Sequence, residues 1–164
     1  MMRVLIVEPA GNLWGSERAL LDVLAGRPQA AFAVCCPPAT PIVAELNKLS
    51  IPLLPFFVAG LHLKSRWARL RAALGVLRAC LRFRPDVIHL NQAGCYRVAM
   101  LAAMLLRLPI VAHVRLFEDA GYLARCAARR GRLRAIIAVS NSIAREIATF
   151  EQLNWIIRHR TSST

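Results

Sequence analysis

Short apolar runs bounded by charges or turn residues recur along the chain and alternate with stretches of helical periodicity. Each run has the length of one β-strand, and the runs are apolar at most of their positions, as in strands that are covered on both faces. Six runs predict strands: Arg3 to Val7, Ala31 to Cys36, Ile51 to Phe56, Asp86 to Leu90, Pro109 to Val114 and Ala135 to Val139.

The stretches between these runs place apolar residues three and four positions apart, which is typical of helices with one buried side. Thr40 is expected to cap the second helix, with Pro41 at its first position, and Ser140 or Asn141 to cap the last. The predicted helices are Ser16 to Ala25, Thr40 to Leu49, Ser65 to Phe83, Cys95 to Leu106, roughly Gly121 to Arg130, and Ser140 or Asn141 to Phe150.

Strands that alternate with helices through short connections predict βαβ units. The expected fold class is α/β: a doubly wound, Rossmann-like, mostly parallel sheet of about six strands with helices on both faces. The 164 residues suffice for one domain. We assign it to residues 1–152 and treat 153–164 as an irregular carboxyl-terminal tail. Ligands of such sheets bind at the carboxyl ends of the strands.

Composition adds a strong positive charge and a surplus of apolar residues. Lys and Arg total 22 against 9 Asp and Glu, a formal charge of +13, which predicts an anionic partner. With 57% hydrophobic residues, the isolated chain is expected to self-associate through exposed apolar surface. Five cysteines without CxxC spacing predict buried free thiols and a reducing, cytoplasmic compartment.

The first predicted strand leads through Gly11, Gly15 and Ser16 into the first predicted helix. The amide groups of a first helical turn have no partners within the helix, and the helix dipole is positive there. A phosphate or carboxylate is therefore expected to bind at Gly15 and Ser16.

Four segments, in order along the chain, resemble motifs of the family 4-like GT-B glycosyltransferases. Trp14 to Leu21 is similar to the GG-x-E-x-x-L signature, with Trp14 in place of the first glycine. Pro85 to His89 resembles the fourth strand of the family, Leu108 to Val111 its next strand, and Ala135 to Ser142 a later strand-to-helix junction. The resemblance covers about 140 residues, the amino-terminal and acceptor-side domain of such enzymes.

The resemblance implies a retaining enzyme that transfers a sugar from a nucleotide-sugar donor to a glycan or lipid-linked acceptor. It implies no metal and no cofactor beyond the donor. The donor-binding domain with its E-x7-E motif has no counterpart in this sequence, so the chain is expected to be a truncated, inactive half. Another polypeptide is one source of the missing half.

Side chains at the predicted strand ends supply the candidate site. Arg115 stands where the family often has a histidine, and His113 lies two positions earlier. These two are the candidates for catalytic roles. We expect Gly15, Asn91 and Arg115 to line one concave, positively charged mouth. The full set of predicted substrate-binding residues is Gly15, Ser16, Glu17, His89, Asn91, Arg115 and Glu118. Capping of the first helix is an alternative role for Glu17.

The third predicted helix carries an apolar stripe from Trp67 to Leu81, flanked by Arg71, Arg78 and Arg82. Such a flank is either a solvated basic face or a contact with an anionic membrane surface or a lipid-linked phosphate. The second reading places the protein peripherally at the inner face of a membrane.

A second function class also fits this composition. A non-catalytic, basic Rossmann-like module that binds an anionic membrane or nucleic acid is the alternative to an enzyme. Nucleic acid is not an expected partner, because aromatic and basic residues are not interleaved on a strand. The absence of G-x-G-x-x-G and of a Gly-x-x-x-x-Gly-Lys loop argues against dinucleotide and P-loop folds. No metal-ligand spacing is present.

Overall fold

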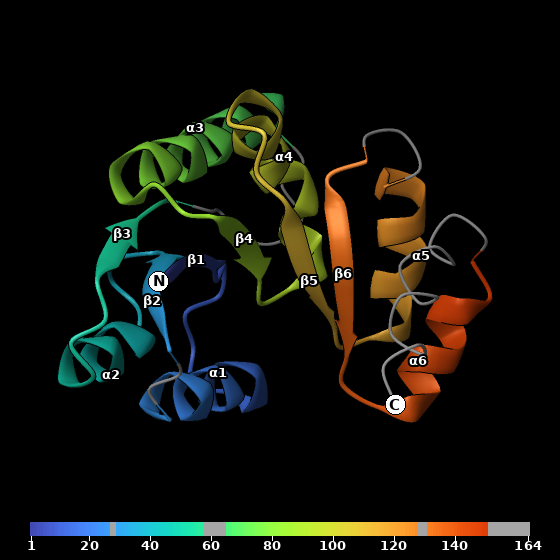
Figure 1. Cartoon of the computed structure of the whole chain (residues 1–164), viewed down its shortest axis with the longest axis horizontal. Coiled ribbons are helices and arrows are strands. Elements are labelled where there is room, and N and C mark those ends of the chain that lie inside the picture. Colours follow the sequence, from blue (N-terminus) through green and yellow to red (C-terminus); the bar gives the residue numbers. More distant parts are fainter. Residues whose placement is uncertain (27–28, 58–64, 128–130, 151–164) are drawn as a thin grey trace.

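The computed structural model describes residues 1–26, 29–57, 65–127 and 131–150. Strands and helices alternate along this part of the chain (Figure 1). The strands are β1 (Met2–Val7), β2 (Ala30–Cys36), β3 (Leu53–Pro55), β4 (Val87–Leu90), β5 (Ile110–Val114) and β6 (Leu133–Ala138). The α-helices are α1 (Gly15–Ala25), α2 (Ile42–Lys48), α3 (Arg66–Phe83), α4 (Tyr96–Leu105), α5 (Phe117–Ala127) and α6 (Asn141–Ala148), and a short 3-10 helix, η1 (Ala93–Cys95), precedes α4.

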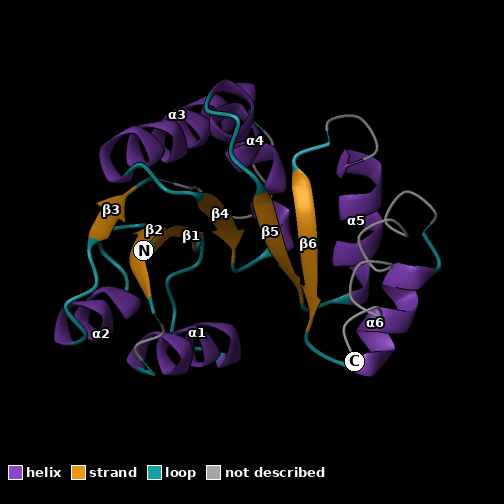
Figure 2. Cartoon of the chain, viewed as in Figure 1, coloured by secondary structure: helices purple, strands orange, loops and turns teal. Residues whose placement is uncertain are grey.

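The six strands form one sheet with the order β3-β2-β1-β4-β5-β6 (Figure 2). Each of the five strand pairings is parallel. The chain runs outward from β1 to β3, crosses back through α3, and then runs outward again from β4 to β6. This confirms the predicted doubly wound, Rossmann-like α/β fold.

Helices cover both faces of the sheet, with a separate apolar core on each. Val4 and Ile6 of β1 pack with residues of α1 and α2. Leu5 and Val7 belong to the larger core, which takes in residues of α3, α4, α5 and α6. In Figure 1, α1 and α2 lie below the sheet and α3 and α4 above it. Adjacent strand residues point to opposite faces, so two covered faces explain why the runs are apolar at most positions.

The start of α5 differs from the prediction. The helix begins at Phe117, four residues before the predicted Gly121. The Asp119 carboxylate accepts hydrogen bonds from the backbone N–H groups of Arg115 (3.4 Å) and Leu116 (3.3 Å). An acidic residue that pairs with free N–H groups stabilises a helix start, and here it extends the helix through a stretch predicted to be a loop.

The predicted cap of the second helix is also wrong. The Thr40 hydroxyl donates to the Pro37 carbonyl (2.8 Å) and makes no cap bond, since α2 begins only after Pro41. Ser140 does cap α6, with its hydroxyl accepting from the Ile143 N–H at 3.3 Å. The predicted tail, 153–164, and its boundary at 152 lie outside the described residues.

The cysteines are free, and four of the five are buried, as predicted. Burial raises the pKa of the Cys36 and Cys80 thiols to about 12, so both stay protonated near neutral pH. In the described part of the chain, no helix has the length and apolar character needed to cross a membrane.

Candidate functional site

A cluster of polar side chains lies at the carboxyl ends of β1, β4 and β5 and at the start of α1. We call it the carboxyl-end cluster. It consists of Glu8, Glu17, Asn91, Gln92, Arg115 and Asp119. The three strands end at the same edge of the parallel sheet, which brings together residues up to 111 positions apart in sequence, from Glu8 to Asp119.

Glu8 anchors the loop that follows β1. Its side chain is fully buried, and its Oε1 accepts hydrogen bonds from the N–H groups of Ala10 (2.8 Å) and Gly11 (3.2 Å). Gly11 has a φ of +67°, and a Cβ there would lie 2.3 Å from the Thr40 hydroxyl oxygen, so only glycine fits. Burial raises the pKa of Glu8, and hydrogen bonds from Asn91 and the two N–H groups oppose the increase.

Asn91 joins Glu8 to Arg115. The side chain of Asn91 is 1% exposed, and its amide nitrogen donates to Glu8 Oε2 at 2.5 Å. Arg115 donates to both oxygens of Asn91, from Nη2 to Oδ1 at 2.8 Å and from Nε to the backbone oxygen at 3.1 Å. A guanidinium has five N–H groups, so three remain for other partners. Asn91 thus holds Arg115 in place and leaves three N–H groups of the guanidinium for another partner.

Glu17 extends the cluster to α1. Its Oε2 accepts a hydrogen bond from the Trp14 N–H at 3.1 Å, which confirms the capping role considered for it. Gln92 Nε2 lies 3.4 Å from both Glu17 Oε1 and Glu8 Oε1. The predicted ligand residues Gly15 and Ser16 lie exposed and half-buried in the first turn of α1.

His89 and His113 form a pair on neighbouring strands. His89 Nε2 and His113 Nδ1 are 3.2 Å apart, and the rings are tilted by 57°. Burial lowers the pKa of both imidazoles to about 4, and the positive charge of Arg115 acts in the same direction. Both rings are therefore neutral at pH 7, and each can donate or accept a hydrogen bond.

The charge of the carboxyl-end cluster differs from the prediction. Three carboxylates, Glu8, Glu17 and Asp119, act electrostatically on the single guanidinium, Arg115. The expectation of a positively charged mouth is therefore wrong at this place. The predicted site included Glu17 but not Glu8 and Asp119, the acidic residues that fold against Asn91 and Arg115.

The other predicted residues lie apart from this cluster. Glu118 is exposed in the first turn of α5. Arg71, Arg78 and Arg82 lie on α3, which packs on the opposite face of the sheet from α1. Among the described residues, no three His, Cys, Asp or Glu side chains are grouped as a metal ion would require.

The sequence-based reasoning missed Glu8 and Gln92 as members of the cluster. Glu8 directly follows the apolar run of β1, and a charged residue at the carboxyl end of a buried strand is a signal for a site. Gln92 follows Asn91 and carried no signal of its own, because its position depends on how η1 begins.

Comparison with known proteins places the chain in a family. Residues 15–154 match the family description "Glycosyl transferase 4-like domain". A comparison with curated proteins found no significant match. The structure resembles HepE from Anabaena, solved with UDP and glucose, with a TM-score of 0.71 and 18% identity over 92% of this chain and 42% of that one.

Two further structures have the same fold. A glycosyltransferase from Rickettsia africae has a TM-score of 0.70 and 16% identity over 90% of this chain and 39% of that one. A UDP-GlcNAc 2-epimerase from Neisseria meningitidis has a TM-score of 0.58 and 13% identity over 90% of this chain and 43% of that one. The chain thus spans about two fifths of the length of these proteins. Its four motifs and the match over most of its length show that it belongs to the glycosyl transferase 4-like domain family.

Proposed function

We propose that this chain is the acceptor-binding part of a retaining, nucleotide-sugar-dependent glycosyltransferase. The carboxyl-end cluster, which lies almost entirely within the matched residues 15–154, carries the proposal. It stands at the edge of the sheet where ligands of doubly wound folds bind. The acceptor in this proposal is a glycan or a lipid-linked sugar.

The chemistry of the cluster favours a hydroxyl-bearing ligand. Glu8, Glu17 and Asp119 are acceptors of hydrogen bonds, and Gln92 offers both a donor and an acceptor. A diphosphate at the start of α1 would lie near the Glu17 carboxylate, which accepts a hydrogen bond from the Trp14 N–H at that helix end. Sugar hydroxyl groups donate and accept hydrogen bonds, so they suit this mixture better than a second anion.

Arg115 is the residue that we assign to contact with substrate. Asn91 and Asp119 fix its position, and its three remaining N–H groups are available to an oxygen of the acceptor or of the leaving phosphate. The neutral pair of His89 and His113 lies on the same side of the sheet as Asn91 and Arg115, which follow them two residues later. His113 is the side chain that we propose for accepting a proton, since a neutral imidazole has one unprotonated ring nitrogen.

The donor is a nucleotide sugar in this proposal, and its binding requires a second domain. HepE, which shares this fold, was solved with UDP and glucose and with UDP-glucose, and this supports a nucleotide-sugar donor for the present chain. We propose that the chain by itself is inactive, that the donor half comes from further sequence or another polypeptide, and that no metal takes part. The buried free thiols support a cytoplasmic location.

A two-part experiment tests the proposal. We expect no release of UDP when the chain alone is incubated with UDP-glucose. In saturation-transfer NMR with a panel of oligosaccharides, we expect a signal from bound sugar. The apparent affinity obtained from this signal is expected to fall at least tenfold in the Arg115→Ala variant. Arg134→Ala, which removes an exposed arginine on β6, is the matched control and is expected to have no effect. UDP release by the chain alone contradicts the proposed inactivity, and sugar contact that survives Arg115→Ala contradicts the assigned site.

A further inference from the structure

Helix α3 buries mainly small side chains and exposes four of its large apolar ones. Its buried residues are Ala72, Ala73, Val76, Ala79 and Cys80. Trp67 is 80% exposed, Leu81 is 56% exposed, and Leu70 and Leu74 are also exposed. Four large apolar residues on one helix are more than scattered surface positions, so this face is built for contact with something other than water.

The charge of α3 has one sign only. The helix contains five arginines and no acidic residue; they are Arg66, Arg69, Arg71, Arg78 and Arg82. The one ion pair in the described part of the chain joins Lys48 to Glu45, and both residues lie on α2. The arginines of α3 therefore have no carboxylate partner there, and a partner for this face must be anionic.

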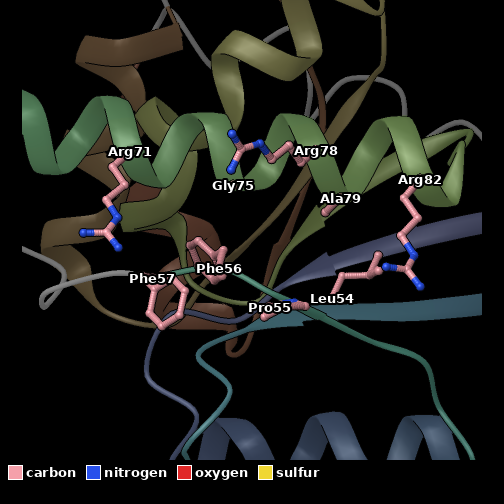
Figure 3. Close-up of a pocket in the computed structure, with 9 residues that line it drawn as sticks. All are labelled: Leu54, Pro55, Phe56, Phe57, Arg71, Gly75, Arg78, Ala79 and Arg82. Atoms are coloured by element: carbon pink, nitrogen blue, oxygen red, sulfur yellow. The ribbon is translucent and has the colours of Figure 1, made fainter.

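A cavity of about 370 Å³ lies between α3 and the end of β3, and we call it the arginine pocket. Its lining is Leu54, Pro55, Phe56, Phe57, Arg71, Gly75, Arg78, Ala79 and Arg82. In Figure 3, Arg71 points from α3 toward Phe57 and Arg82 toward Leu54, whereas Arg78 lies along the helix near Gly75. The Arg71 guanidinium lies 5.5 Å from the ring centroid of the exposed Phe57. This volume is at the lower end of the usual range for small-molecule sites, so the pocket fits a compact anionic group.

We propose that α3 and the arginine pocket dock the protein on an anionic membrane surface. The lipid phosphate enters the arginine pocket, and Trp67, Leu70 and Leu74 enter the boundary between headgroups and acyl chains. A basic helix with exposed Trp and Leu is the composition that lies in this boundary. The inference is independent of the proposed function, because the arginine pocket and the carboxyl-end cluster share no residue.

The apolar residues distinguish a membrane from a soluble phosphate. Arginines alone suffice for a soluble anion, and a site for it gains nothing from exposed Trp67 and Leu70. An anionic bilayer uses both features, because its phosphates are charged and the layer beneath them is apolar. Arg71, Arg78 and Arg82 stand one to two turns apart along α3, so the row of charges is longer than the one phosphate that the pocket holds, and a bilayer offers further phosphates beside it.

Vesicle flotation with the whole chain tests the proposal. We expect binding to phosphatidylcholine vesicles that contain about 30% phosphatidylglycerol, no binding to pure phosphatidylcholine, and weaker binding as NaCl rises from about 0.1 M to about 0.5 M. Each arginine near an anionic surface is worth about fivefold in partitioning. The triple variant Arg71→Gln, Arg78→Gln, Arg82→Gln is therefore expected to bind about 100-fold less.

Matched variants separate this site from overall charge. Replacing the exposed arginines Arg18, Arg134 and Arg145 by Gln removes the same three charges on α1, β6 and α6, and the expected loss is less than tenfold. Trp67→Ala alone is expected to weaken binding several-fold with the salt dependence unchanged. Circular dichroism and thermal unfolding establish that each variant is folded.

Four outcomes overturn the proposal. The first is equal binding to neutral and anionic vesicles, and the second is equal losses in the two triple variants. The third is saturable binding of soluble glycerol phosphate with the affinity of the vesicles, which makes the arginine pocket a site for a free phosphate compound. The fourth is a dimer, seen without lipid, that Trp67→Ser dissociates, because a second copy then covers this face.

Discussion

Asn91 is the residue on which the carboxyl-end cluster depends. It is almost fully buried, and its amide group is used on both sides, toward Glu8 and toward Arg115. A buried polar group that loses its partner lowers the free energy of unfolding by its full desolvation cost. Both neighbours therefore depend on this one side chain. In the structure Asn91 positions Arg115; its own contact with substrate remains a prediction.

Replacing Asn91 tests this role. Asn91→Ala is expected to lower the free energy of unfolding by about 1–3 kcal/mol, because the buried Glu8 carboxyl loses a donor. Asn91→Asp is expected to cost more at pH 8 than at pH 5, because it sets a second carboxylate against Glu8 and one of them must be protonated. Urea unfolding at both pH values measures this. Asn47→Ala, at an exposed position on α2, is the control and is expected to cost less than about 0.5 kcal/mol.

The histidine pair predicts a pH dependence of stability. The pKa of His89 and of His113 is about 4 in the folded protein, against about 6.5 in an unfolded chain. The unfolded state therefore takes up protons first. Stability is full above pH 6.5 and falls as the pH decreases toward 4. At pH 5.5 the expected loss is about 1–2 kcal/mol for the pair, less than for two fully buried groups because His113 is only half-buried.

Thermal unfolding of the double variant His89→Gln, His113→Gln isolates this effect. Glutamine keeps a donor and an acceptor but does not titrate, so the difference in melting temperature between wild type and variant should change from pH 7.5 to pH 5. Glu8 changes stability in the opposite sense, because its raised pKa favours the folded state as the pH decreases. Wild type and variant both contain Glu8, so its contribution cancels in the difference between their melting temperatures. A difference that is constant across this range contradicts the assignment.

At the scale of elements, Gly75 sets how closely α3 approaches β3. A Cβ on Gly75 would lie 2.9 Å from the Cβ of the buried Phe56, whose backbone is close behind it at 3.6 Å. Alanine favours a helix by about 1 kcal/mol over glycine, whereas overpacking costs about 1–3 kcal/mol. The close atom is the Cβ of Phe56, which cannot move without its backbone, so overpacking should prevail.

Gly75→Ala is therefore expected to lower the free energy of unfolding by about 1 kcal/mol and to weaken vesicle binding, since the arginine pocket must widen. Gly26→Ala at the end of α1, where a Cβ meets only ordinary contacts, is the control and should be neutral or stabilising. Urea unfolding of both variants measures the difference. A Gly75→Ala protein that is more stable than wild type shows that Phe56 moves away.

At the scale of the whole molecule, apolar side chains remain exposed beside the carboxyl-end cluster as well as on α3. Leu116 is 61% exposed and Phe117 55% exposed, and both follow Arg115 directly. We expect the isolated chain to self-associate at roughly 50 µM, with a mass by light scattering that rises with concentration. Leu116→Ser with Phe117→Ser should reduce the association, whereas Trp67→Ser should not. A monodisperse monomer in wild type contradicts this prediction.

Much of the fold could be predicted from local pattern. All six strands were predicted within two residues at each end, because covered strands are apolar at most positions and turn residues or charges bound them. The start of α5 was wrong because Asp119 pairs with N–H groups of Arg115 and Leu116, a contact that hydrophobic spacing does not record. The apolar stripe of α3 was predicted. Whether the stripe faces the core or solvent was not, because the small residues of the helix form an equally continuous face.

The sequence by itself determined the order of strands and helices, the family motifs and the excess of arginine, because these are properties of neighbouring residues. The sequence also predicted that Asn91 and Arg115 share one site. Only the tertiary structure decided that Glu8 bonds to Asn91 and that four large residues of α3 face solvent. Strand ends far apart in sequence become neighbours only when the parallel sheet forms. The buried face of a helix depends on the space left for its side chains, and no single helix contains that information.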